Sequence, residues 1–66
     1  MEDRNIVIML CHARDKAKAT AQRNAADYIR WNPGDRERRN KYLSIELAGI
    51  DHLYHSMIEE IKNSLG

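Results

Sequence analysis

The chain begins with an uninterrupted hydrophobic run, six apolar residues from Ile6 to Cys11. Continuous apolar runs of this length are typical of strands that are covered on both faces. We therefore expect a short β-strand over about residues 5–10, with alternate side chains on opposite faces.

This strand has no partner within its own chain, because the rest of the sequence favours helix. An unpaired strand leaves a row of backbone donors and acceptors open. A second copy of the protein, related by a two-fold axis, would supply the missing strand. We therefore expect a mainly α fold built from β-α-α chains, assembled as an intertwined homodimer whose strands pair between subunits.

The segment from about residue 12 to residue 31 favours a helix, because it contains six alanines and neither glycine nor proline. Small side chains recur on one stripe at helical spacing: Ala13, Ala17, Ala21, Ala25 and Tyr28. Such a stripe lets another helix approach closely but contributes little apolar area. We interpret it as a helix–helix seam, with a docking groove as the alternative.

The predicted turn is Asn32-Pro33-Gly34-Asp35, because proline disfavours a helical backbone at the residue before it. Either Asn32 caps the next helix, with Pro33 at its first position, or Asp35 is the cap. The second helix then covers about residues 35–64. Since the connection, residues 32–35, is short, the two helices should fold back as an antiparallel hairpin.

A 4-3 rhythm of apolar residues runs through the second helix, as in a coiled-coil seam: Leu43, Leu47, Ile50, Tyr54, Met57 and Ile61. Further apolar residues widen this stripe beyond what one partner helix needs. We therefore expect the second helix to contact both the alanine-rich helix and a second subunit. The predicted dimer interface comprises Ile6, Val7, Ile8, Met9, Leu10, Leu47, Ile50, Leu53, Tyr54, Met57 and Ile61.

Sixty-six residues form a single domain, residues 1–66, and a chain of this length is marginally stable alone. A single cysteine cannot form an internal disulfide, so oligomerisation is the remaining route to stability. The lone cysteine and the lack of a signal peptide favour the cytoplasm, and the apolar run is too short to span a bilayer. The net charge of +1 gives no overall attraction to nucleic acid.

No cluster of residues predicts catalysis, a cofactor or a metal site. His52, His55 and Glu59 share one helical face, but the other helix offers no complementary ligands. Cys11 and His12 are adjacent and point in different directions, so we expect no thiol nucleophile. The histidine pair is interpreted as solvated or at the edge of an interface, with a metal-binding bundle that uses His52, His55 and Glu59 as a third hypothesis. The cysteine is interpreted as a small buried hydrophobe.

The most basic stretch, Arg36–Lys41, lies at the start of the second helix. Its four cations could contact phosphates in a nucleic-acid complex. Acidic residues interleave with these cations, which do not share one helical face. We therefore interpret the stretch as a solvated first turn, with a nucleic-acid-binding accessory protein as the alternative function.

Aromatic residues flank the predicted turn: Tyr28, Trp31 and Tyr42. Aromatic side chains with a polar tip are enriched at interfaces. Trp31 either closes the end of the hairpin or anchors a partner. We predict a partner-binding site that comprises Tyr28, Trp31, Arg38 and Tyr42.

Residues Leu43–Leu47 look like the Ser-x-Glu-Leu-Asp signature of small two-helix aspartyl-phosphate phosphatases. This chain has Ala48 where that signature carries its reactive aspartate. The departure removes the phosphatase mechanism, and we expect a protein that is not an enzyme.

A broader resemblance begins at Cys11–Asp15 and continues through Asn24–Trp31, Arg38–Arg39 and Tyr42–Leu43. In these segments the chain is similar to the small early proteins encoded between the exonuclease and excisionase genes of lambda-like temperate phages. The resemblance covers nearly the whole chain and implies a dimer with one strand and two helices per subunit. It also implies a regulator in the host cytoplasm that favours lytic development by contacting a host or phage protein.

Overall fold

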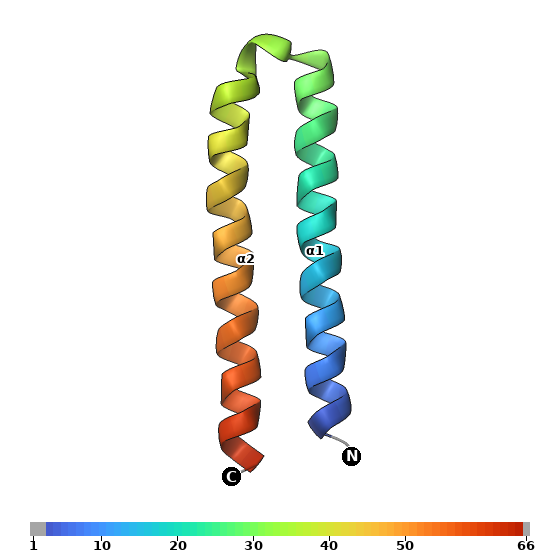
Figure 1. The fold of residues 1–66 in the computed structure, drawn as a ribbon, viewed down its shortest axis with the longest axis vertical. Helices are drawn as coiled ribbons and strands as arrows, with labels where there is room; N and C mark the ends of the chain where they lie inside the picture. The colour runs from blue at the N-terminus through green and yellow to red at the C-terminus, as the bar shows by residue number, and fades with distance from the viewer. Residues whose placement is uncertain (1–2, 66) are drawn as a thin grey trace.

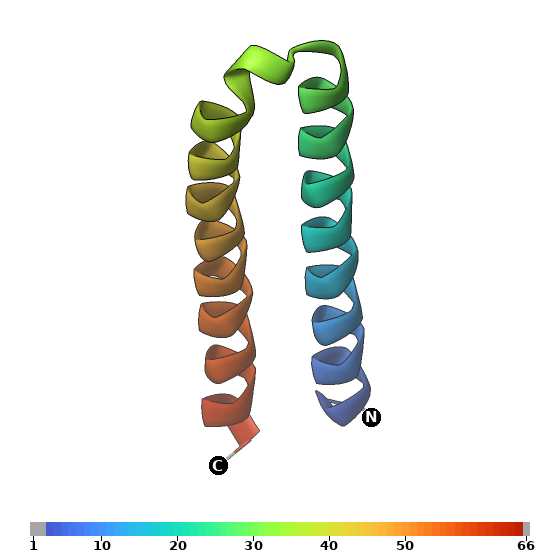
Figure 2. The ribbon, with the colours of Figure 1, turned by 45° about the horizontal axis from the view of Figure 1, so that its top comes forward.

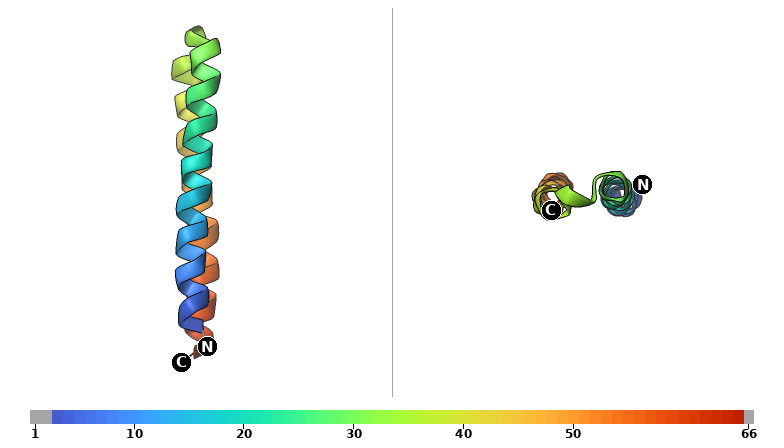
Figure 3. Two further views of the ribbon diagram at one scale, coloured as in Figure 1. Left: turned by 90° about the vertical axis from the view of Figure 1, so that its right-hand side faces the viewer. Right: turned by 90° about the horizontal axis from the view of Figure 1, so that it is seen from above.

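The computed structural model describes residues 3–65 as two long antiparallel helices joined at one end (Figure 1). Helix α1 is Asp3–Trp31, the short 3-10 helix η1 is Pro33–Asp35, and helix α2 is Arg36–Leu65. The hairpin measures 50 × 16 × 7 Å along its principal axes. Seen from above, the helices lie side by side in a single layer (Figure 3).

The predicted N-terminal strand is wrong, because residues 5–10 lie within α1 and the described residues contain no strand. The β-α-α chain and the pairing of strands between subunits are wrong with it. A helix satisfies the backbone groups of this segment internally, whereas a lone strand leaves them unpaired. The helix also places Ile6 and Leu10 beside Met57 and Ile61, near the end of α2. The hydrophobic run is therefore the start of α1.

Helical geometry separates two isoleucines that a strand would place on one face. Ile6 and Ile8 are two positions apart, which in α1 corresponds to a rotation of about 200°. Ile6 borders α2 and is 44% exposed, whereas Ile8 lies on the other side of α1 and is 49% exposed. The two residues therefore cannot share one interface with a partner.

A short connection joins the helices at one end of the hairpin (Figure 2), and hydrogen bonds around Asn32 hold it. The backbone N–H of Asn32 donates to the carbonyl of Tyr28 at 2.9 Å, and its side-chain Nδ2 donates to the same oxygen at 3.0 Å. Pro33 begins η1, where its missing N–H needs no partner. The Asn32 side chain therefore caps the end of α1 and makes no capping hydrogen bond to the helix that follows.

The two helices contact each other along a thin seam and do not enclose a core. Ala21, Ala25 and Ile58 are the buried hydrophobic residues of the part that the structure describes. The predicted seam residues of α2 are all half-buried: Leu43, Leu47, Ile50, Tyr54, Met57 and Ile61. Because domains are built from at least two packed layers, this single layer buries little apolar surface on its own.

Candidate functional site

The turn end of the hairpin carries a hydrogen-bonded cluster centred on the carboxylate of Asp35. The Tyr28 hydroxyl donates to Asp35 Oδ2 at 2.6 Å, and Arg38 Nη2 donates to the same oxygen at 2.8 Å. The hydrogen bond from Tyr28 lowers the pKa of Asp35 below its ordinary value of 3.8, and Arg38 lowers this pKa further. The charge of Asp35 is therefore balanced within the cluster, which links the end of α1 to the start of α2.

Arg39 lies between two aromatic rings of the same cluster. Its guanidinium carbon is 5.8 Å from the centre of the Tyr28 ring and 5.1 Å from that of Tyr42, within the range of a cation–π interaction. Arg39 Nη2 also lies 4.0 Å from Glu46 Oε1. Arg39 Nε and Glu46 Oε1 are buried and have no hydrogen-bond partner. Buried polar atoms without a hydrogen-bond partner are uncommon in native protein structures.

Trp31 ends α1 and has 79% of its surface exposed. The guanidinium carbon of Arg30 lies 6.0 Å from its ring centre. The indole therefore does not close the end of the hairpin, which was one of its two predicted roles. Its exposure favours the other role, an anchor for a partner.

The predicted partner-binding residues, Tyr28, Trp31, Arg38 and Tyr42, all lie at or next to the turn. Tyr28, Arg38 and Tyr42 line one hollow of about 360 Å³, together with Asp35 and Arg39. Trp31 lies outside this hollow. The predicted site lacks Asp35 and Arg39. The sequence contains a pattern that could have indicated them, because Asp35, Arg39 and Tyr42 are spaced by four and then three residues, which places them on one side of a helix.

A second hollow continues along the same side of the hairpin at its middle. It lies between three alanines of α1 and two residues of α2: Ala13, Ala17, Ala21, Glu46 and Ile50. The alanines and Tyr28 are spaced by four, four and seven residues, so one stripe of α1 borders both hollows. The alanine stripe is therefore partly a seam with α2 and partly the floor of a groove.

A third hollow lies at the open end, where Ile6 and Leu10 face Met57 and Ile61. Ile6 precedes Ala13 by seven residues, which places it on the same side of α1 as the middle hollow. We call the side of the hairpin lined by these three hollows the groove face. It extends over the length of both helices.

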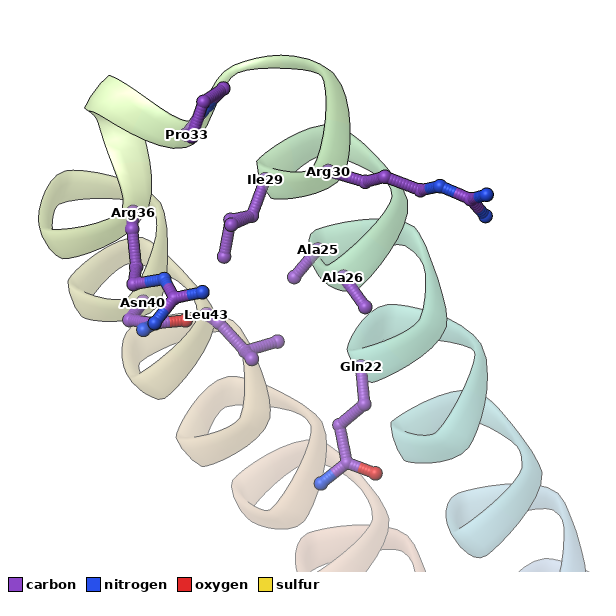
Figure 4. Close-up of a pocket in the computed structure, with 9 residues that line it drawn as sticks. All are labelled: Gln22, Ala25, Ala26, Ile29, Arg30, Pro33, Arg36, Asn40 and Leu43. Carbon is purple, nitrogen blue, oxygen red and sulfur yellow. The ribbon is translucent and has the colours of Figure 1, made fainter.

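A separate hollow of about 550 Å³ lies on the other side of the seam, next to the turn (Figure 4). Ile29 and Leu43 point into the space between the helices, whereas Arg30 points away from it. Arg36 and two amide side chains supply its polar groups, and its lining contains no carboxylate, histidine or cysteine. This hollow therefore has no pair of groups suited to acid–base or nucleophilic catalysis.

The predicted dimer-interface residues divide between the groove face and other parts of the hairpin. Five of them line the groove face: Ile6, Leu10, Ile50, Met57 and Ile61. Leu53 follows Ile50 by three residues on the same stripe of α2 and is 58% exposed. Val7, Leu47 and Tyr54 are half-buried and line none of the three hollows. Ile8 and Met9 are exposed and also lie outside the groove.

Within residues 3–65, no three histidine, cysteine, aspartate or glutamate side chains are grouped closely enough to hold a metal ion. His52 and His55 are exposed on α2. Glu59 Oε2 lies 3.9 Å from Lys62 Nζ. Cys11 is half-buried in α1, and the neighbouring His12 is exposed.

The structure does not gather the cations of Arg36–Lys41 on one face. Arg36 lines the hollow of Figure 4, whereas Arg39 lines the groove face. Lys41 borders a further hollow beside Gly34. Arg38 borders the hollows of both Arg39 and Lys41, and the acidic residues Asp35 and Glu37 line these two hollows as well. The cations therefore surround the start of α2 and alternate with carboxylates.

Comparisons of the chain with protein-family models, with curated proteins and with solved structures found no match. Neither helix, over the residues that the structure describes, has a segment long and apolar enough to cross a membrane. The surface of the hairpin is therefore the basis for assigning a function.

Proposed function

We propose that the chain is a non-enzymatic protein-interaction module that binds another protein through the turn end of its hairpin. The observation that carries this proposal is the exposure of two aromatic side chains there, 79% for Trp31 and 58% for Tyr42. Tryptophan, tyrosine and arginine are the residues most enriched at the energetic centres of protein interfaces. Trp31 is the main anchor in this proposal, and Tyr42 supports it.

The cluster beside these aromatic residues is already ordered. The hydrogen bond to Asp35 fixes the Tyr28 ring, and Arg39 packs between Tyr28 and Tyr42. Side chains that are fixed before binding lose less conformational entropy when a partner arrives. The turn end can therefore bind a partner without first rearranging.

The charge of the turn end defines the chemistry of the partner. Residues 27–42 contain five arginine and lysine side chains and three acidic ones, a net charge of +2. Arg38 balances Asp35, so the excess charge belongs to cations outside this pair. An acidic protein surface with an apolar pocket for an indole ring is complementary to this end.

The resemblance to small early proteins of lambda-like phages supplies the biological setting of the proposal. In that setting the partner is a host or phage protein in the host cytoplasm. Binding would sequester or redirect the partner and so favour lytic development. This mechanism requires occupancy of a surface and no catalytic chemistry.

Nucleic-acid binding through Arg36–Lys41 is the alternative function. Two of these cations are engaged within the hairpin, since Arg38 pairs with Asp35 and Arg39 stacks on tyrosine rings. Arg36 and Lys41 border different hollows. Because phosphate binding relies on several cations along one face, this arrangement favours a protein partner.

The effect of the expressed chain on a lambda-like temperate phage tests the proposal. We expect wild-type chain to raise the fraction of infections that become lytic. Trp31→Ala should weaken this effect at least about tenfold, because truncating an anchor costs more than about 1.4 kcal/mol of binding. Met9→Ala is the matched control, since Met9 is 67% exposed near the other end of α1 and should behave as wild type.

Circular dichroism must show equal helix content for both variants. Equal losses of effect in both, or none in Trp31→Ala, would contradict the proposed site. No effect of the wild-type chain would contradict the phage setting. A larger loss in the Arg36→Gln, Lys41→Gln double variant, together with salt-dependent DNA binding by the wild type, would indicate the nucleic-acid alternative.

A further inference from the structure

The hairpin exposes more surface than a compact protein of its size. Its accessible surface is 5263 Å² for a mass of 7.7 kDa. Compact monomers of this mass expose roughly 4,300 Å². The difference, about 900 Å², is close to the ~800 Å² that each partner buries in a protein interface of standard size.

The small side chains of the groove face are centred on the middle of the hairpin. Ala17 is the midpoint of α1, and Ala13 and Ala21 lie about one turn to either side of it. Ile50 lies within one residue of the midpoint of α2. A two-fold axis through this middle, perpendicular to the helices, would place Ala13 of one copy opposite Ala21 of the other. Small side chains at the crossing allow the two hairpins to approach closely.

The two ends of the groove face carry opposite charges. Arg39 borders the hollow at the turn end, and Glu60 borders the hollow at the open end. The same two-fold axis brings the turn end of one copy to the open end of the other, so that Glu60 and Arg39 approach each other between copies. If both turns lay at the same end of the dimer, Arg39 of one copy would lie near Arg39 of the other, and Glu60 near Glu60, so that like charges would repel.

We propose that a second copy of this chain covers the groove face, so that two hairpins form a four-helix bundle with their turns at opposite ends. The interface is isologous, and each copy supplies the second layer that the other lacks. Trp31 lines none of the three hollows, so the bundle presents one Trp31 at each end. Tyr42 lines the groove face, so in the bundle it is shared with the second copy, and Trp31 alone remains fully available to the partner proposed above. Self-association therefore does not use the main anchor of that proposal.

The mass of the chain in solution, measured by light scattering at micromolar concentration, is the first test. We expect twice the chain mass of 7.7 kDa. Leu53→Lys should weaken self-association on the order of 100-fold, because it introduces a charge into the apolar interface of each copy. Ile8→Lys is the matched control, since Ile8 is also about half exposed but lies off the groove face. A folded wild-type monomer, or equal dissociation of both variants, would overturn the proposal.

Pulsed electron paramagnetic resonance tests the arrangement without relying on Leu53→Lys remaining folded. Gly34→Cys in a Cys11→Ser background places one spin label per chain at the turn, where a Cβ atom meets nothing within 4 Å. The proposed bundle predicts a label separation near the 50 Å length of the hairpin. A separation of about 20 Å, the width of two helices, would show both turns at one end and overturn the proposal.

Discussion

Lys18 of α1 donates hydrogen bonds to both carboxylate oxygens of Asp51 of α2, at 3.0 and 3.1 Å. It is the one ion pair recorded between the two long helices in the described part of the chain. The Lys18 side chain is 32% exposed and that of Asp51 is 51% exposed, so water and salt screen their attraction. The pair therefore helps to fix the alignment of the helices more than it stabilises them.

Removing this ion pair should have a small effect on stability. We expect Asp51→Asn to lower the free energy of unfolding by less than about 1 kcal/mol, and by less again at high salt. Urea unfolding of the wild type, Asp51→Asn, Lys18→Met and the double variant measures the coupling between the two side chains. A coupling energy of several kcal/mol would contradict the description of a screened surface pair.

Shortening Ile58, the large buried side chain among the described residues, should have a much greater effect. Ile58 is 7% exposed, so Ile58→Ala should destabilise the protein by on the order of 2–4 kcal/mol. Ile45→Ala makes the same chemical change at a position that is 66% exposed, and should cost less than about 0.5 kcal/mol. Chemical denaturation of both variants tests this difference. Equal losses would mean that the contact between the helices lies on another face of α2.

The Asp35 cluster should make the stability of the folded protein depend on pH. Its lowered pKa means that Asp35 contributes stability above the ordinary pKa of 3.8, and that this contribution is lost as the pH falls from 3.8 through the lowered value. Tyr28→Phe removes the hydroxyl that has the largest effect, so the pKa of Asp35 should rise toward its ordinary value. Titration followed by carboxyl-carbon NMR measures both pKa values. The same pKa in both proteins would rule out the hydrogen bond in solution.

Gly49 should be replaceable at a gain in stability. It lies in the middle of α2, where glycine costs roughly 0.5–1 kcal/mol relative to alanine. A Cβ atom built at this position meets nothing within 4 Å, so no close approach within the hairpin requires glycine. Gly49→Ala should therefore raise the melting temperature followed by circular dichroism. A lower melting temperature would show that the partner copy approaches α2 at this point.

The helical hairpin could be predicted from the sequence, because Asn32-Pro33-Gly34 interrupts two strongly helical segments. The start of α1 was predicted wrongly, since a run such as Ile6–Cys11 suits a buried strand and a helix equally well. The two cases differ in what the run packs against. Ile6 and Leu10 lie beside Met57 and Ile61 of α2, a contact that the sequence alone does not reveal.

The types of residue in the candidate site could be predicted from the sequence, but the contacts between them could not. Aromatic residues next to a turn indicate an interaction surface, and Trp31 and Tyr42 fit this pattern. The position of Arg39 between two tyrosine rings depends on how α1 packs against α2, and so does the groove face. The alanine stripe was predicted as a seam, but its periodicity does not reveal that Ala13 and Ala17 also border an open hollow.

The dependence of thermal stability on protein concentration tests most directly whether the hairpin needs a second layer over its groove face. If two copies fold together, the melting temperature followed by circular dichroism should rise steadily as the concentration increases, because association stabilises only the folded state. At the lowest concentrations the helical signal should be lost. A melting temperature that stays constant over a hundredfold range of concentration, with full helix content at the lowest, would contradict this account.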